Sequence, residues 1–330
     1  MKHFLLLFVL GSCLGEARTW TDVQGRTIQG NIVDANEKEV TVDRAGKEVV
    51  IPLSRLSEED QEFVSEWLED KGDAKPVAVA ASGPLMFDGK TLKAGGAMNL
   101  FTYDYSEEHL VRVEKNHKAK DTGYKMAIAV PEGFDPSKPQ RIFVVSAPVN
   151  NDQQRTSGNI GAFGSYAASC VANGWICFAY DTNIGRSNHN SDLLLSFDKL
   201  KQVWPDIVHW QFAVGGFSGG AKGCFDPCAF YLDQKLRVTG AFLGGCNEDR
   251  SGNAKDRYNT TSSAFRSLKV FTSTGTKDNL VSKSQAEAVS ASLKKNGMRN
   301  QRNEFFEGGH QIHQPHFDAA LKWFAEAAEK

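Results

Sequence analysis

The sequence lacks several features that would narrow its class at once. After residue 17 it has no run of about 18 consecutive apolar residues, so nothing there predicts a membrane-spanning helix. Basic (38) and acidic (40) residues nearly cancel, and a net charge of −2 gives no reason to expect nucleic acid or an anionic membrane as a partner. No repeat of about 20 to 50 residues is present, which argues against a solenoid.

Cysteine is also scarce, with six residues in 330. Five of them follow residue 17, namely Cys170, Cys177, Cys224, Cys228 and Cys246. Their odd number leaves at least one without a disulfide partner in the same chain, and no histidines with metal-ligand spacing accompany them. We therefore interpret most of them as small buried apolar residues and predict no metal site.

The first 17 residues, MKHFLLLFVLGSCLGEA, have the pattern of an export signal: Lys2, an apolar stretch over 4–10, then small residues. The stretch is too short to span a bilayer. Cleavage after Gly-Glu-Ala (15–17) and lipid attachment at Cys13, within the lipobox-like LGSC, both fit, and a buried N-terminal strand is the alternative. We predict an exported bacterial protein that is periplasmic, secreted or a membrane-anchored lipoprotein.

A small β module is predicted over residues 18–70. It contains three short β-rich runs separated by turn-forming residues, at 26–33, 38–43 and 47–53. A helix is expected over 56–68, because Ser57 is a good N-cap, Asp60 completes a capping-box pattern, and the residues that follow form an apolar face.

A linker is predicted over residues 71–90, where Ala, Gly and Pro dominate the first part. The charge changes across it. Residues 18–75 carry 14 acidic and 8 basic residues, a net charge of −6, whereas the chain beyond them carries +4. We therefore predict a second module over 91–330.

The segments RTWTDVQGRTIQGNIV, VTVDRAGKEVVIPLSRLS and EEDQEFVSEW resemble the SHD1 (Sla1 homology domain 1) family over about 50 residues. The resemblance implies a small SH3-like β-barrel before the second module. It also implies a peptide or glycan ligand for this barrel, and a stabilising or spacing role stays open beside it.

From about residue 97 onward, β-rich and helical segments alternate. Short apolar runs predict strands at 124–134, 141–148, 175–181, 210–216, 238–245 and 269–275. Helices are expected at 161–174, 191–204, 218–232, 282–297 and 317–330, with Pro227 expected to end or kink the third. This alternation predicts an α/β fold with a mostly parallel sheet and helices on both of its faces.

The segment AVGGFSGGAKG (213–223) contains the pattern Gly216-x-Ser218-x-Gly220, which matches the nucleophile elbow of serine hydrolases. At this density of glycine the pattern alone is weak. Its position between a predicted strand and a predicted helix strengthens it, because such a turn strains the serine backbone and leaves no room for side chains nearby. The serine would then lie at a helix N-terminus, which favours a developing oxyanion.

An acid and a base follow in the order that a triad requires. Asp278 lies in the loop after a buried strand, in GTKD, and is favoured over Asp249, which follows the previous strand. His310 follows two glycines before the last helix and is favoured over His313 and His316, since the glycines form a loop that can direct it toward the serine.

From about residue 97 to the end, the chain resembles the α/β-hydrolases, particularly their secreted esterases. GYKMAIAVPEGFDPSKPQRIFVV, GFSGG, GTKD and GGH carry the resemblance. It implies Ser218 as nucleophile, His310 as general base and then acid, Asp278 as the group that orients the histidine, and no cofactor. The expected substrate is a small-molecule or polysaccharide-linked carboxylic ester. A serine peptidase of the same fold and a non-catalytic binding protein on a degenerate hydrolase fold are the alternatives.

The chain departs from that family after the third strand of the fold, where VVSAPVNN replaces the usual His-Gly. This loop normally supplies one N–H of the oxyanion hole, and Pro148 has no N–H to donate. Gly219 is expected to donate one hydrogen bond. Val149 and Asn150, through its backbone or side chain, are the candidates for the second.

Overall fold

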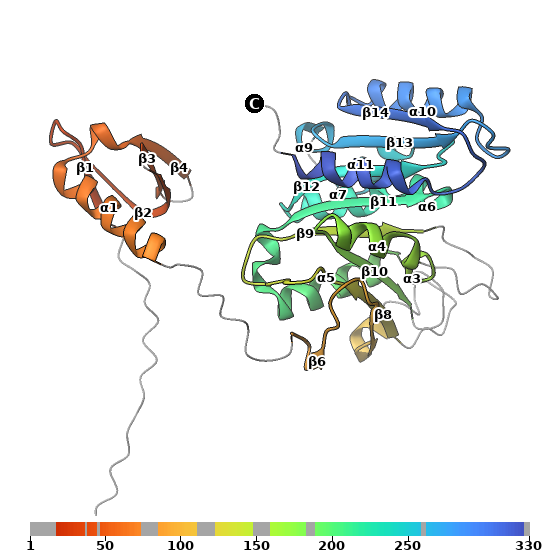
Figure 1. The fold of residues 1–330 in the computed structure, drawn as a ribbon, viewed down its shortest axis with the longest axis horizontal. Coiled ribbons are helices and arrows are strands. Elements are labelled where there is room, and N and C mark those ends of the chain that lie inside the picture. The colour runs from red at the N-terminus through yellow and green to blue at the C-terminus, as the bar shows by residue number, and fades with distance from the viewer. Residues whose placement is uncertain are drawn as a thin grey trace, which may run out of the picture. The chain divides into compact units, whose positions relative to one another are not determined.

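The computed structural model describes residues 18–36, 38–44, 47–73, 85–110, 123–147, 159–182, 189–258 and 262–326. The chain divides into two compact units, Met1–Gly83 and Pro84–Lys330 (Figure 1). No helix within these described ranges is long and apolar enough to cross a membrane.

The first unit has a four-stranded antiparallel sheet in the spatial order β1-β2-β3-β4, formed by Arg18–Thr21, Thr27–Ala35, Glu39–Arg44 and Lys47–Pro52. A 3₁₀ turn, Leu53–Arg55, leads to α1, Glu58–Asp73. Alternate residues of β3 point inward, and the resulting core consists of Trp20, Val40, Val42, Leu56 and Val64. The three predicted strands and the helix are present, and β1 is a further strand. The SH3-like barrel of the SHD1 family stays a prediction.

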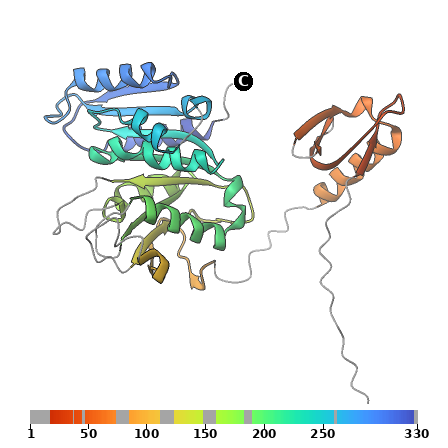
Figure 2. The ribbon, with the colours of Figure 1, turned by 180° about the vertical axis from the view of Figure 1, so that it is seen from behind.

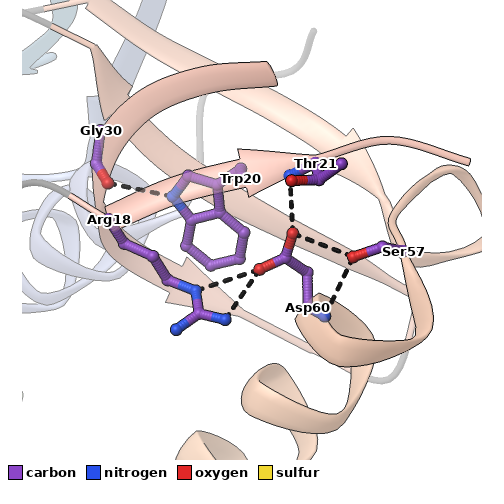
Figure 3. Close-up of polar contacts among 6 residues, drawn as sticks. All are labelled: Arg18, Trp20, Thr21, Gly30, Ser57 and Asp60. Carbon is purple, nitrogen blue, oxygen red and sulfur yellow. Dashed lines mark hydrogen bonds and ion pairs between the residues drawn. The ribbon is translucent and has the colours of Figure 1, made fainter. Parts of the chain in front are cut away.

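Asp60, at the start of α1, ties the helix to β1 (Figure 3). Its Oδ1 accepts hydrogen bonds from Nε and Nη2 of Arg18 (3.0 and 2.9 Å), and its Oδ2 accepts from the Thr21 N–H (2.6 Å) and Ser57 Oγ (3.2 Å). Ser57 Oγ also accepts from the Asp60 N–H (3.3 Å), so the predicted N-cap bond is formed. The capping box is not completed, because the Ser57 N–H donates to Thr21 O (2.8 Å) instead.

We expect Asp60→Ala to destabilise the first unit by about 3 kcal/mol, because it leaves a guanidinium and a partly buried backbone N–H without their acceptor. The control is Arg26→Ala. It removes an ion pair with Asp22 in which the arginine side chain is 74% exposed, and should cost less than about 1 kcal/mol. Hydrogen exchange of residues 18–73, read by mass spectrometry on the full chain, measures both. Equal losses in the two variants would contradict this role of Asp60.

The second unit is built on an eight-stranded sheet in the order β14-β13-β12-β11-β9-β10-β8-β7. The strands are β7 Asn99–Asp104, β8 Gly123–Ala129, β9 Arg141–Ser146, β10 Ile176–Thr182, β11 Gln211–Phe217, β12 Arg237–Gly244, β13 Lys269–Gly275 and β14 Gln301–Phe306. β8 runs antiparallel to both of its neighbours, β7 and β10. All the other pairs of adjacent strands are parallel. A small hairpin, β5 Met86–Phe87 and β6 Lys90–Thr91, precedes the sheet.

Helices cover both faces of this sheet (Figures 1 and 2). On one face, α4 (Gly164–Ala172) and α11 (Gln314–Ala325) share a core with α3 (Asn159–Ala162). The other face is covered by α5 (His189–Val203), α7 (Phe225–Asp233) and α10 (Lys283–Lys295). Shorter helical segments complete the unit: η2 Pro205–His209, α6 Gly219–Gly223, α8 Ser251–Arg257 and α9 Ser262–Arg266.

The predicted fold class is confirmed. Numbered by their order in the chain, the eight strands lie in the spatial order 1-2-4-3-5-6-7-8 with the second antiparallel, which is the sheet of the α/β-hydrolase fold. Two strands of this sheet, β7 and β14, were not predicted. The helix expected over 218–232 is interrupted, but at Cys224 and not at Pro227. Pro227 lies in the first turn of α7, where a missing N–H costs no helical bond.

Candidate active site

Ser218 lies on the turn between β11 and α6, and its backbone is strained. Its φ is 56° and its ψ is −119°, a conformation that residues with a side chain rarely adopt. The Ser218 N–H donates to Gly244 O at the end of the neighbouring strand β12 (2.8 Å). Strain of this kind costs on the order of 1 to 3 kcal/mol and persists only where the surrounding structure enforces it.

The two glycines of the predicted elbow are required by close packing against the end of β9. A methyl group on Gly216 would lie 2.1 Å from Ser146 O and 2.7 Å from the carbonyl carbon of Gly220. A methyl group on Gly220 would lie 2.2 Å from the same oxygen and 2.8 Å from Ala147 Cα. These neighbours are backbone atoms, which cannot rotate away, so only glycine fits at either position.

We expect Gly220→Ala to destabilise the second unit by about 3 kcal/mol or more and to abolish any activity of the turn, because the new methyl group displaces β9 or the turn. Gly223→Ala is the control in the same short helix. Its methyl group would meet only Ser146 Oγ, at an ordinary 3.6 Å, and alanine favours a helix, so this variant should be neutral or slightly stabilising. Thermal unfolding should separate the two by roughly 6 to 12 °C. Similar melting temperatures would contradict the packing argument.

His310 and Asp278 form a hydrogen-bonded pair. His310 Nδ1 lies 2.8 Å from Asp278 Oδ2, and the other carboxylate oxygen accepts from the N–H groups of Leu280 (2.8 Å) and Val281 (2.9 Å). The Asp278 side chain is 1% exposed, against 16% for His310. Burial raises the pKa of Asp278, but the bonds from His310, Leu280 and Val281 outweigh it and hold the pKa below its ordinary value. The carboxylate is therefore ionised at neutral pH, and Nδ1 is the donor to it.

Backbone contacts fix the two loops that carry this pair. Thr276 N–H donates to Phe306 O (2.8 Å), and Lys277 N–H donates to Gly308 O (2.9 Å). Gly275 lies so close to the histidine loop that a methyl group there would be 2.3 Å from Gly308 O. The acid and the histidine are thus held by two loops that follow adjacent parallel strands, β13 and β14.

The end of β12 lies against both the turn that carries Ser218 and the ring of His310. Gly244 accepts the Ser218 N–H, and the following residue, Gly245, has a φ of +53°. A methyl group on Gly245 would lie 2.8 Å from the Phe217 ring and 3.0 Å from the His310 ring, whose own centroids are 4.5 Å apart. Ser218, Asp278 and His310 therefore lie on the same side of the sheet, at the carboxyl ends of its parallel strands. Sequence reasoning gave Gly245 no role, although the Gly-Gly pair after a buried strand was the available signal.

The rival residues have other partners. Asp249 accepts hydrogen bonds from Ser251 N–H (2.9 Å), Ser292 Oγ (2.7 Å) and Asn296 Nδ2 (2.9 Å), which anchor its loop to α10. His316 Nδ1 lies 2.9 Å from Ser273 Oγ. The pKa of His316 is lowered, mainly by burial and to a lesser extent by the neighbouring His313. His313 itself stacks on the Phe306 ring at 4.4 Å. Within the part of the chain that the structure describes, none of these three side chains is hydrogen-bonded to His310 or Asp278.

Of the three residues expected to form the oxyanion hole, the structure describes one. Gly219 is the first residue of α6, so its N–H has no acceptor within that helix. Val149 and Asn150 lie outside the described residues, as does Cys13. Ser146 and Ala147, which belong to the VVSAPVNN segment, lie against the nucleophile turn.

The five cysteines after residue 17 are buried and unpaired, as expected for small apolar core residues. Burial raises the pKa of Cys246 to about 11, which keeps its thiol protonated. Within the ranges that the structure describes, no group of three histidine, cysteine, aspartate or glutamate side chains could hold a metal ion.

Comparison with known proteins found no matching family model and no matching curated protein. Among solved structures, the chain is similar to esterase 2 of the planctomycete Thermogutta terrifontis with propionate bound (17% identity, TM-score 0.39, 63% of this chain and 89% of that one). The same esterase phosphoramylated by tabun gives 16% identity and a TM-score of 0.40 over 68% and 91% of the two chains.

The chain is also similar to a protein from Bacteroides ovatus assigned as a dipeptidyl aminopeptidase IV (13% identity, TM-score 0.43, 69% of this chain). It spans only 35% of that longer chain. All three TM-scores are below 0.5, so the assignment of the fold depends on the strand order and not on these likenesses. By that order and by the single antiparallel strand, the second unit of this chain has the α/β-hydrolase fold.

Proposed function

We propose that the second unit is a serine hydrolase that acts on carboxylic esters through Ser218, His310 and Asp278. One observation carries the proposal. A serine with a strained backbone and a histidine held by an ionised, buried aspartate lie on the same side of the sheet, at the carboxyl ends of its parallel strands. Backbone strain is costly, and a purely structural turn would have no need to retain it.

Acylation starts at the Ser218 hydroxyl. With its proton on Nδ1, His310 has a free lone pair on Nε2, which takes the hydroxyl proton as Oγ attacks the ester carbonyl carbon. The carbonyl electrons move to oxygen, which becomes an oxyanion. The N–H of Gly219, the residue that follows the nucleophile, is the candidate hydrogen-bond donor to this oxyanion. Collapse of the intermediate breaks the bond to the alcohol, which leaves with the proton from Nε2, and the acyl group stays on Ser218.

Deacylation repeats these steps with water. His310 takes a proton from the water as it attacks the acyl carbon, and returns that proton to Ser218 Oγ when the acid departs. Asp278 stays ionised throughout, holds the imidazole in one tautomer and stabilises the imidazolium that forms in each half-reaction. Neither half-reaction needs a cofactor.

A peptidase is the second candidate, since the same three groups cleave amides. The preference for esters derives from the resemblance of residues 123–145 and of the three short motifs to secreted esterases. The test compares p-nitrophenyl acetate and butyrate, feruloyl esters and acetylated sugars with peptide anilides. Turnover of esters at least about 100-fold faster than of every anilide supports the proposal, and efficient anilide cleavage would replace it with a peptidase.

We further propose that the chain is exported and that the first unit binds a peptide or glycan. Support for export comes from the first 17 residues, and support for the ligand from the SHD1 resemblance. The proposal of export is tested by expressing the chain in a bacterial host and identifying its mature N-terminus by mass spectrometry. A chain retaining Met1 in the cytoplasm would exclude export, and a lipid on Cys13 would identify a lipoprotein.

A further inference from the structure

A second set of buried polar groups lies beside the nucleophile turn, where β9 and β10 end. Asn159, the first residue of α3, is 2% exposed, and Asp181, near the end of β10, is 5% exposed. Neither belongs to the group formed by Ser218, His310 and Asp278. Buried polar side chains are expected to be fully bonded, so their partners indicate what they hold in place.

Asn159 joins the ends of β9 and β10. Its Oδ1 accepts a hydrogen bond from the Ala147 N–H (2.7 Å), and its Nδ2 donates to Tyr180 O (2.9 Å). Asp181 in turn holds Asn159. Its two oxygens accept from the backbone N–H groups of Asn159 (3.0 Å) and Ile160 (2.6 Å), which fixes the first turn of α3. The series of bonds therefore runs from Asp181 through Asn159 to Ala147.

Ala147 and Ser146 are also the residues that fill the space beside the nucleophile turn. The Gly220 Cα faces Ala147 Cα, and both Gly216 and Gly220 face Ser146 O, too closely for a methyl group to intervene. Because nothing but backbone occupies this contact, a displacement of Ala147 must be absorbed by the turn that carries Ser218. A side chain that fixes Ala147 thus acts on the position of the serine.

We propose that Asn159 and Asp181 are positioning residues of the hydrolase site, which hold the end of β9 against the glycines of the nucleophile turn and so set the position of Ser218. The inference rests on the proposed function, because it assigns these two residues to the same reaction. They touch no reacting atom and act through Ala147 and the turn.

The chemistry of Asp181 gives this role a pH signature. Burial raises its pKa to about 6, although the N–H groups of Ile160 and Asn159 and the nearby Lys125, its partner on β8, lower it. Above this pH the ionised carboxylate accepts two hydrogen bonds with full charge. Below it the group is a neutral acid that resembles an asparagine, and the hold on α3 weakens.

The test measures kcat and KM for p-nitrophenyl butyrate and the rate of fluorophosphonate labelling, on the full chain, from about pH 5 to 8. Asn159→Ala is expected to lower kcat and the labelling rate about 10- to 100-fold, with KM changed less than about 3-fold. Asp181→Asn is expected to lower kcat about 10-fold at pH 8 and to approach the native rate below pH 6. Dividing the rate of the variant by the rate of the native protein at each pH cancels every pH dependence that the two proteins share.

Two matched controls remove buried polar groups elsewhere in the same unit. Asn99 is a buried carboxamide that bridges the backbone of Lys93 and Ile128, and Asp192 is a buried carboxylate that accepts from the Tyr105 hydroxyl. Asn99→Ala and Asp192→Asn should lower the melting temperature by a similar amount but keep kcat within about 3-fold.

The inference fails if Asn159→Ala is labelled by the fluorophosphonate and hydrolyses the ester at the native rates. It also fails if the ratio of the Asp181→Asn rate to the native rate does not change with pH. Should Asn159→Ala not fold, the Asp181→Asn ratio alone decides between these results. A native protein that fluorophosphonate does not label overturns both this inference and the proposed function. A labelled native protein with variants labelled equally fast overturns this inference alone.

Discussion

Ser218→Ala is expected to abolish ester hydrolysis, with a loss in kcat on the order of 10⁴- to 10⁶-fold, and to leave the fold intact. The variant removes only the oxygen that bonds to the acyl group, while the backbone of the turn stays fixed by Gly244 O and by the end of β9. His310→Ala should be about as severe, because the serine then has no base. The double variant should be no worse than either single one, since these groups act as a unit.

His313→Ala and His316→Ala are the controls for the histidine. Both lie within six residues of His310 in the sequence, but His313 stacks on the Phe306 ring and His316 is hydrogen-bonded to Ser273. Each should keep most of the activity and lose some stability. Near-native turnover by Ser218→Ala would mean that the strained turn is only a glycine-rich turn, and a lethal His316→Ala with a mild His310→Ala would mean that the base is misassigned.

Asp278→Asn is expected to cost about 10⁴-fold in kcat, the loss found for the same change in the best-studied protease triad. The structure gives the reason. One carboxylate oxygen accepts from two backbone N–H groups, so the carboxamide oxygen of the variant must stay there and its NH₂ must face His310 Nδ1. His310 Nδ1 then has to accept a hydrogen bond from this NH₂ group, so the ring proton moves to Nε2. With its Nε2 protonated, the histidine cannot take the serine proton.

Asp249→Asn is the matched control, a second aspartate that follows a parallel strand but is bonded to Ser251, Ser292 and Asn296. It should change kcat less than about 3-fold and lower the melting temperature slightly. If Asp249→Asn were the inactive variant and Asp278→Asn were mild, the acid of the triad would be misassigned.

The pH dependence of stability follows from the same pair. Because the pKa of Asp278 is lowered in the folded protein, its contribution to stability is fully present above the ordinary pKa of an aspartate, near 3.8. It is lost as the pH falls through the lower folded value. Asp278→Asn should therefore lose stability relative to the native chain at neutral pH, with the difference shrinking below about pH 4.

The buried strands of the second unit could be predicted because each is a short apolar run between turn residues. The edge strands β7 and β14 could not. β14 reads QRNEFF, with three of its six residues exposed and only one buried, because an edge strand over this part of the sheet has little core to face. Its membership of the sheet is decided by pairing with β13, which sequence periodicity does not report.

The elbow was predictable for a physical reason that the structure supplies in detail: the glycines face backbone atoms of β9 at distances that exclude a methyl group. What could not be predicted is which distant segment fills that space. Ala147, Asn159 and Asp181 are separated by more than ten residues from one another, and no spacing rule connects an asparagine at a helix start with the end of another strand.

The central claim is that Ser218 is a nucleophile activated by His310, and covalent labelling tests it most directly. The full native chain is treated with a fluorophosphonate probe, digested, and the modified residue is located by mass spectrometry, with heat-denatured protein and Ser218→Ala as controls. The account predicts one adduct, on Ser218, that forms only in the folded native chain. The absence of an adduct, or an adduct on another residue that persists in Ser218→Ala, would contradict it.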